Sequence, residues 1–196
     1  PQHRASGFAV GLDGWLNFTS GESTKELVSH RASKTYSVQH HDIAWNPDTG
    51  EIRATSGDTQ FIRARDDFGN WFGNSNSYPM YQFVVDSRYQ TKTSIAGDSK
   101  QNLLTPAVAP TVFPRSRTVD RFNDLFAFNR FTSACSSMIV RTPGLGPDML
   151  GAALVCEPVH NLVARFQVKP SGSSFIGERF EADKTFDFFT STDPFS

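Results

Sequence analysis

Short hydrophobic runs with partial alternation, separated by turn residues, recur along the chain. Residues 8–10 and 15–19, "FAV" and "WLNFT", flank the turn sequence "GLDG". The same arrangement recurs at 46–51, where "NPDTGE" lies between "DIAW" and "IRAT", and at 169–175, where "KPSGSSF" lies between "ARFQV" and "FIGERF". Asp, Gly and Pro between β-prone runs favour tight turns. The pattern therefore predicts a series of antiparallel hairpins.

Helical periodicity is weak by comparison. The best helix candidate covers 117–131, whose hydrophobic residues at helical spacing are Val119, Phe122, Leu125 and Phe126. Its asparagines and the preceding Pro114 make a loop with a single turn an equally good interpretation. Residues 87–117 are polar and contain several prolines, which predicts a long surface insertion.

Many short strands without a βαβ rhythm leave three all-β architectures: a sandwich, a barrel or a propeller. A repeated motif helps to choose among them. Both "GLDGWLNFTSG" and "NPDTGEIRATSG" contain a hairpin turn that leads into a strand ending in Thr/Ser-Gly. Propeller blades recur at roughly 40–50 residues. The repeat therefore favours an all-β fold of the propeller type.

The composition narrows the functional classes. The chain has 196 residues, which suggests one domain, and 19 basic against 20 acidic residues give a net charge of -1. Such a chain has no basic field for nucleic acid or an anionic membrane. No apolar run approaches the ~20 residues of a membrane span. Because it starts at Pro1 and stops at "STDPFS", we interpret it as a portion of a longer protein.

The two cysteines, Cys135 and Cys156, do not form the CxxCH motif, so we expect no haem within this chain. They belong to two predicted strands on either side of "RTPGLGPDMLG". In a hairpin centred near 145–146, residues whose numbers sum to 291 face each other, and these two satisfy that sum. Directly opposite residues lie within bridging reach. We predict a disulfide, with two thiols in a reducing compartment as the alternative.

Seven motifs carry a resemblance that spans nearly the whole chain. They are "GLDGWLNFTSG", "WNPDTGEIRATSGDTQF", "RDDFGNWFGNSNSYP", "VFPRSRTVDRFND", "NRFTSACSS", "VCEPVHNLVARF" and "STDPF". In this order they resemble the propeller of the putative membrane-bound dehydrogenases of planctomycete-type bacteria. That group is similar to the sorbosone and soluble glucose dehydrogenases, which use pyrroloquinoline quinone (PQQ). The resemblance implies that residues 1–196 form part of a six-bladed β-propeller, about three to four blades.

The resemblance also implies a function. It predicts a quinoprotein-like dehydrogenase that oxidises a sugar or an alcohol, with PQQ and calcium as cofactors. Electrons would pass to a haem protein such as a cytochrome c, in the periplasm or outside the cell. A partial propeller cannot close its ring, so another chain or segment would complete it.

The general base implied by the resemblance is His3. "HRASGFAVGLDGWLNFTSG" is similar to a pattern of the soluble glucose dehydrogenases in which a histidine takes the hydroxyl proton, and His3 occupies the matching position. Imidazole titrates near neutrality and suits this role. Two residues depart from the pattern: Gly7 stands in place of an Arg, and Glu22 replaces the closing Asp. The alternative is a structural histidine.

Five residues are candidates for cofactor binding. His160 and Asn161 lie in "CEPVHNLV", at the predicted inner start of a strand, and His41 lies near the place where relatives carry an Arg-Asn pair. The other two, Asn74 and Asn76, lie in the amide-rich "NWFGNSNSYP", where relatives have a cysteine in place of Asn74. Amide side chains bond hydroxyls and carbonyls. The alternative for His160 is a structural role. The alternative for the asparagines is a wide loop.

Two further clusters suggest other chemistry. His40, His41 and Asp42 have metal-ligand side chains, but neighbours on a strand point to opposite faces, so the metal, if any, stays unassigned. Asp66 and Asp67 diverge for the same reason, which argues against a hydrolase. Two functions besides the dehydrogenase remain open: a non-catalytic propeller that serves as a scaffold or interaction subunit of a larger assembly, and a carbohydrate-binding module.

Overall fold

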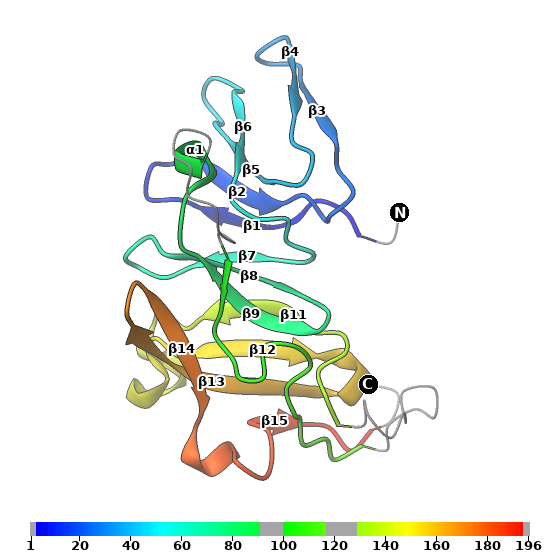
Figure 1. Cartoon of the computed structure of the whole chain (residues 1–196), viewed down its shortest axis with the longest axis vertical. Coiled ribbons are helices and arrows are strands. Elements are labelled where there is room, and N and C mark those ends of the chain that lie inside the picture. The colour runs from blue at the N-terminus through cyan, green and yellow to red at the C-terminus, as the bar shows by residue number, and fades with distance from the viewer. Residues whose placement is uncertain (1–2, 91–99, 117–128, 194–196) are drawn as a thin grey trace. The chain divides into compact units, whose positions relative to one another are not determined.

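The computed structural model describes residues 3–90, 100–116 and 129–193. Short antiparallel strands dominate it, which confirms the all-β prediction (Figure 1). The chain forms two compact units, the first from residues 1–73 and 82–101 and the second from 74–81 and 102–196. The candidate helix at 117–131 lies almost entirely outside the described residues.

The first unit contains a four-stranded antiparallel sheet in the order β1-β2-β5-β6. Its strands are β1 (Ser6–Val10), β2 (Leu16–Thr19), β5 (Asp42–Trp45) and β6 (Ile52–Thr55). The predicted turns at 11–14 and 46–51 join β1 to β2 and β5 to β6. The two copies of the repeated motif therefore lie in one sheet. This corrects the interpretation of the repeat, because it marks two hairpins of one sheet and not two successive blades.

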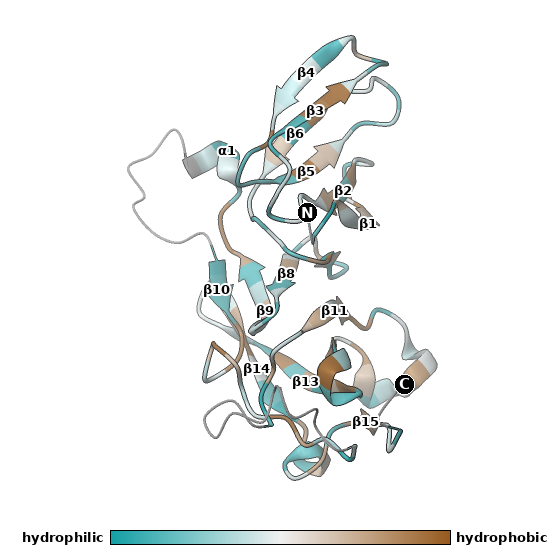
Figure 2. Ribbon diagram, turned by 90° about the vertical axis from the view of Figure 1, so that its right-hand side faces the viewer, coloured by the Kyte–Doolittle hydropathy of each residue, from teal (hydrophilic) through white to brown (hydrophobic). Residues whose placement is uncertain are grey.

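The two faces of this sheet differ in polarity. Leu16, Trp45 and Ile52 are paired across neighbouring strands and lie on the apolar face of the sheet. The hairpin of β3 (Glu26–Ser29) and β4 (Lys34–Ser37), inserted between β2 and β5, supplies Leu27 and Tyr36 to the core on that face. β3 is accordingly hydrophobic in Figure 2. The opposite face presents the row Asn17–Ala44–Arg53, which makes it the polar side.

A second four-stranded sheet has the order β10-β9-β8-β7. Its strands are β7 (Arg63–Arg65), β8 (Trp71–Ser75), β9 (Tyr78–Phe83) and β10 (Lys100–Asn102), and the short helix α1 (Ser87–Gln90) follows β9.

The structure corrects part of the predicted surface insertion at 87–117. Leu103, Leu104 and Val112 are buried, and the Leu103 amide donates to the carbonyl of Met80 while its carbonyl accepts from the Gly177 amide. Backbone bonds on both sides and burial of apolar side chains integrate this segment into the second unit.

The second unit is built on a sheet in the order β11-β12-β13-β14, with β15 paired to β13. The strands are β11 (Cys135–Ile139), β12 (Ala153–Glu157), β13 (Leu162–Ser171), β14 (Ser174–Arg179) and β15 (Phe189–Thr190). Short 3₁₀ turns cover Pro143–Leu145, Pro147–Met149, Pro158–His160 and Glu181–Asp183. The predicted loop "RTPGLGPDMLG" joins β11 to β12. The predicted turn at 169–175 is shorter in the structure, because β13 continues to Ser171 and β14 begins at Ser174.

The register of β11 and β12 places Cys135 directly opposite Cys156, as the hairpin arithmetic predicted. A bulge follows, and Ser136 adopts a left-handed φ of 50°. Both cysteines are free thiols in this structure, so the predicted disulfide is not formed here and stays a prediction.

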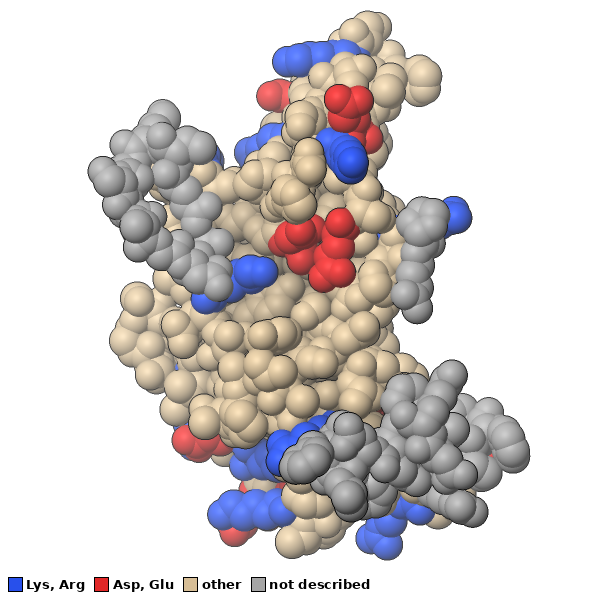
Figure 3. Space-filling view, turned by 45° about the vertical axis from the view of Figure 1, so that its right-hand side comes forward, with Lys and Arg blue, Asp and Glu red and all other residues tan. Residues whose placement is uncertain are grey.

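The surface carries no single-sign charge field on the face drawn in Figure 3, where Lys and Arg are interspersed with Asp and Glu. In the described part of the chain, no helix is long and apolar enough to cross a membrane.

Candidate functional site

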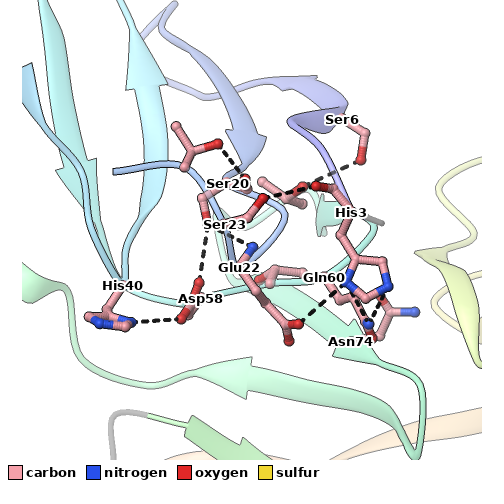
Figure 4. Close-up of polar contacts among 12 residues, drawn as sticks. His3, Ser6, Ser20, Glu22, Ser23, His40, Asp58, Gln60 and Asn74 are labelled. Carbon is pink, nitrogen blue, oxygen red and sulfur yellow. Dashed lines mark hydrogen bonds and ion pairs between the residues drawn. The ribbon is translucent and has the colours of Figure 1, made fainter. Parts of the chain in front are cut away.

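His3 lies in the segment that precedes β1, and its side chain is 20% exposed. Its Nδ1 is 3.7 Å from Oε2 of Glu22 (Figure 4). The amide nitrogen of Gln60 lies 2.8 Å from its Nε2 and 3.1 Å from its Nδ1, and the ring of Phe61 meets the imidazole edge-on. The Nδ1 of the imidazole thus lies near a carboxylate, a buried amide lies within reach of both ring nitrogens, and part of the side chain stays accessible. This pair, His3 and Glu22, is the central feature of the candidate site.

Glu22 reaches His3 because of the turn that ends β2. Its backbone has a left-handed φ of 59°, which redirects the chain after the strand. The Ser20 hydroxyl accepts from the Glu22 amide, and the Thr24 hydroxyl donates to the Ser20 carbonyl at 2.7 Å. In the sequence, Glu22 stands out only as a replacement in a motif, although the Gly-Glu-Ser turn signal at 21–23 could have indicated its orientation.

The turn also contacts the segment that carries His3. Gly21 packs so closely on Arg4 that a Cβ there would lie 2.6 Å from the Arg4 carbonyl, and its φ is 66°. The Ser23 hydroxyl donates to the His3 carbonyl at 2.9 Å. Glycine is therefore needed at this position for the turn to hold His3 against Glu22.

The loop after β6 brings Asp58 and Gln60 to the same place. Its anchor is Asp42, whose fully buried carboxylate accepts from the amide and the hydroxyl of Thr59, at 2.9 and 2.6 Å. The guanidinium of Arg63 adds a bond of 3.0 Å to that carboxylate and also donates to the Ser56 carbonyl. Nothing in the sequence around Asp42 indicates this anchor.

Burial raises the pKa of Glu22, and the nearby charge of Asp58 adds to the effect, while His3 opposes it. Asp58 is itself bonded to the Ser20 hydroxyl at 3.1 Å and lies 3.4 Å from His40. The site is therefore an imidazole–carboxylate pair in which the carboxylate holds its proton more readily than an ordinary glutamate.

The departure at Gly7 has a structural cause. Gly7 has a φ of 66°, and a Cβ added there would lie 2.6 Å from the Cα of Ile62. An Arg could not occupy this position without displacing the backbone at 61–62.

The side chains of His40, His41 and Asp42 do not point to a common position. His41 Nδ1 lies 3.2 Å from the Thr55 carbonyl, whereas His40 is turned towards Asp58 by a left-handed φ of 61°. Asp42 is occupied by Thr59 and Arg63. In the part of the chain that the structure describes, no group of three or more His, Cys, Asp or Glu side chains could hold a metal ion.

His160 lies in the second unit, at the end of the 3₁₀ turn Pro158–His160, and is fully buried. Its Nδ1 is 3.3 Å from Oε1 of Glu157, which is also fully buried. That carboxylate accepts from the amides of Thr132 and Ser133, at 3.1 and 2.9 Å, and from the Ser133 hydroxyl at 2.7 Å. Glu157 was not singled out in the sequence, although its spacing of three residues from His160 is visible there.

The three predicted asparagines lie in the second unit and have different hydrogen-bond partners there. Asn74, at the end of β8, is fully buried and donates to the Ala134 carbonyl at 3.1 Å. The carbonyl of Asn76 accepts from the Ala134 amide. Asn161 ends its 3₁₀ turn with a left-handed φ of 52° and donates to the Asp193 carbonyl at 2.9 Å. Asn74 and Asn76 thus share a neighbour, while Asn161 faces a different loop.

PQQ is rich in carboxylate and carbonyl oxygens, so its site must supply hydrogen-bond donors or cations. The donor of Asn74 is used by Ala134, and a proton on Nδ1 of His160 faces Glu157. The buried atoms of these two residues that have no hydrogen-bond partner are acceptors, namely Oδ1 of Asn74 and Nε2 of His160 in the tautomer that Glu157 selects. Asn74 and His160 as arranged therefore do not fit the quinone.

Two cavities lie away from the predicted residues. One of about 830 Å³ in the second unit is lined by residues that include Phe113, Phe166 and Arg179. Another, of about 290 Å³, lies in the first unit beside Arg53 and Trp71. None of the six predicted site residues lines either of these two cavities.

Comparison with known proteins gives one match. A family model described as "Domain of unknown function (DUF7133)" matches residues 1–196. No curated protein and no solved structure gives a significant match. Because the family model covers the chain from end to end, this protein belongs to the DUF7133 family.

Proposed function

We propose that this chain is part of a dehydrogenase that oxidises a hydroxyl group of a sugar or an alcohol, with His3 as the general base. The single observation that carries the proposal is the pair of His3 and Glu22. An accessible imidazole with a carboxylate at one nitrogen is the usual arrangement of a general base, because the carboxylate orients the ring.

The step assigned to this chain is removal of the hydroxyl proton. With Nδ1 facing Glu22, the lone pair of Nε2 points to the amide of Gln60. A substrate hydroxyl would replace that amide as the donor to Nε2 and transfer its proton there. Glu22 would stabilise the resulting imidazolium. No other step is assigned to the residues described.

The remaining parts of the proposal follow from the resemblance of the seven motifs to the planctomycete-type dehydrogenases. The chain would be part of a β-propeller, and the four-stranded antiparallel sheet of the first unit has the form of one blade. The oxidant would be PQQ with calcium, the electron acceptor a cytochrome c, and the location periplasmic or extracellular. Since Asn74 and His160 do not offer donors to PQQ, other residues would have to bind it, in this chain or in one that completes the propeller.

A second candidate function is a non-catalytic scaffold or interaction subunit. The observation that favours it is the complete burial of Asn74 and His160, whose side chains support the fold through Ala134 and Glu157. In this case the chain would bind neither PQQ nor substrate, and His3 would serve only to pack the segment before β1.

The test begins with the purified chain, supplied with PQQ and calcium, a panel of sugars and alcohols, and an electron-accepting dye. The dehydrogenase proposal predicts dye reduction that depends on PQQ, and loss of at least ~100-fold in rate for His3→Gln. His30→Gln is the matched control, because His30 is exposed in the turn between β3 and β4. Turnover of His3→Gln at the rate of the control variant would refute His3 as the base.

A mass and absorbance spectrum of the purified chain separates the two functions. Bound quinone, or its uptake on titration, supports the dehydrogenase. Absence of PQQ binding to the chain together with any chain that co-purifies with it, at any concentration tested and with the fold intact, supports the scaffold.

A further inference from the structure

Cys135 and Cys156 are the directly opposed residues at one end of the β11–β12 pair. Residues in this relationship have Cβ atoms about 4.5–5.5 Å apart, close to what a disulfide requires. Both side chains are partly exposed, and an oxidant can therefore reach them. The geometry thus provides two thiols that need little backbone movement to join.

The two cysteines flank the residues that bind the buried Glu157. Cys156 immediately precedes Glu157 in β12. Cys135 begins β11, just after the segment whose Thr132 and Ser133 amides donate to the Glu157 carboxylate. A covalent link at this position would fix the two segments that meet at the carboxylate.

We propose that Cys135 and Cys156 are an oxidative modification site, at which an intramolecular disulfide fastens β11 to β12 and thereby holds Thr132 and Ser133 on Glu157. β11 is at the edge of its sheet order and is interrupted by a bulge. Such a strand has a partner on one side of the ladder only, which makes it the strand that gains most from a covalent link.

The oxidant in this proposal is a small-molecule or protein disulfide. One cysteine thiolate attacks a sulfur of that disulfide, which gives a mixed disulfide and releases one thiolate. The second cysteine thiolate then attacks the mixed disulfide at the cysteine sulfur and releases the other thiolate. The chain loses two protons and two electrons, and the oxidant leaves as two thiols.

The environment favours a disulfide that forms slowly and persists. Burial raises the pKa of both thiols, and for Cys135 the charge of Cys156 adds to the effect. A raised pKa lowers the thiolate fraction and slows the first attack at neutral pH. It also makes each cysteine a poor leaving group once the bond exists, which slows reduction. The disulfide is therefore a lasting structural link, not a rapidly reversed switch.

The test incubates the full chain with glutathione disulfide at several ratios to glutathione, and then measures its mass and melting temperature. We expect a product lighter by two hydrogen atoms, with a Tm raised by roughly 5–10 °C, as the closing of a ~20-residue loop predicts. The Cys135→Ser/Cys156→Ser double variant should melt like the reduced chain at every ratio. Formation of glutathione adducts or intermolecular dimers alone would overturn the proposal.

A shifted thiol provides the matched control. In Cys135→Ser/Met138→Cys the thiol lies opposite Leu154 and diagonal to Cys156, at about 7–8 Å, which is beyond the reach of a disulfide, so no intramolecular disulfide should form with Cys156. The effect on Glu157 is read from hydrogen exchange at the Thr132 and Ser133 amides. Oxidation should slow both at least ~10-fold relative to the reduced chain. Equal exchange in the two forms would refute the effect on Glu157 even if the disulfide forms.

Discussion

Arg63 and Asp42 form a buried ion pair, with Nη1 of the guanidinium 3.0 Å from Oδ2 of the carboxylate and side-chain exposures of 4% and 0%. The guanidinium also lies over the rings of Trp71 and Phe83, at 4.9 and 4.6 Å from their centroids. The pair joins β5 to β7 and carries the loop on which Gln60 reaches His3. The candidate site therefore depends on a contact that takes no part in its chemistry.

Replacing Arg63 by Leu should destabilise the chain by about 3–5 kcal/mol, because Asp42 is left as an uncompensated buried charge. Chemical denaturation measures this loss. The control is Arg53→Leu, which breaks the exposed pair with Asp13 and should change stability by less than about 1 kcal/mol. Similar losses for the two variants would contradict the importance assigned to the buried pair.

Gly21→Ala should lower the melting temperature and shift the NMR signals of the His3 ring. The added methyl group meets the Arg4 backbone, and the left-handed φ is strained for alanine. Gly14→Ala is the matched control, since Gly14 has a φ of 78° but nothing within 4 Å of its Cβ position. We expect a loss of about 1 kcal/mol for the control and at least twice that for Gly21→Ala. His3 signals that are unchanged in Gly21→Ala would argue against the turn as the support of His3.

The raised pKa of Glu22 predicts a dependence of stability on pH. The folded chain binds the Glu22 proton more tightly than the unfolded chain, so this residue makes folding less favourable as pH rises from about 4.5 through its folded pKa. Glu22→Gln removes the effect. The variant should gain stability relative to the parent at pH 7 compared with pH 4, by less than about 0.5 kcal/mol because the side chain is 40% exposed. A gain confined to pH 4 would reverse the sign and refute the assignment.

Glu157→Gln should destabilise the second unit by about 2–4 kcal/mol. An amide nitrogen would replace one acceptor oxygen and face the donors of Thr132 or Ser133, and the His160 proton would lose its charged partner. Chemical denaturation of the parent and the variant measures the difference in their free energies of unfolding. The control is Glu178→Gln, whose partner Lys169 is exposed, and it should have little effect. A neutral result for Glu157→Gln would contradict the proposed network.

The parts of the fold that were predictable are those specified by local sequence. The turns at 11–14 and 46–51 contain residues that favour a reversal, and the position of a turn fixes which residues face each other across a hairpin. The hairpin arithmetic also gave the opposition of Cys135 and Cys156, but the pairs nearer the turn sum to 292, so in the structure this opposition depends on the bulge that follows Cys135.

The parts that were missed depend on contacts between distant residues. Nothing near Asp42 indicates that Thr59 and Arg63 will enclose its carboxylate, and the motif at 40–42 instead suggested a metal. The burial of His160 depends on Glu157 and on Ser133, which lies far earlier in the chain. The role of Glu22 depends on a left-handed turn, a conformation that composition does not reveal.

The bulge in β11 shifts the register of the strand, so the alternation of side chains between the two faces differs before and after it. Cys135 and Met138 are an odd number of residues apart, so a regular strand would direct them to opposite faces, yet they oppose Cys156 and Leu154, which share one face of β12. The residue at the left-handed position, Ser136, absorbs the difference. A chain of this family that lacks one residue at the bulge would have a regular β11–β12 ladder and keep the two cysteines opposed. A deletion nearer the turn would instead move the core-facing side chains of the strand to the solvent face. Length variation in this hairpin should therefore concentrate at the bulge.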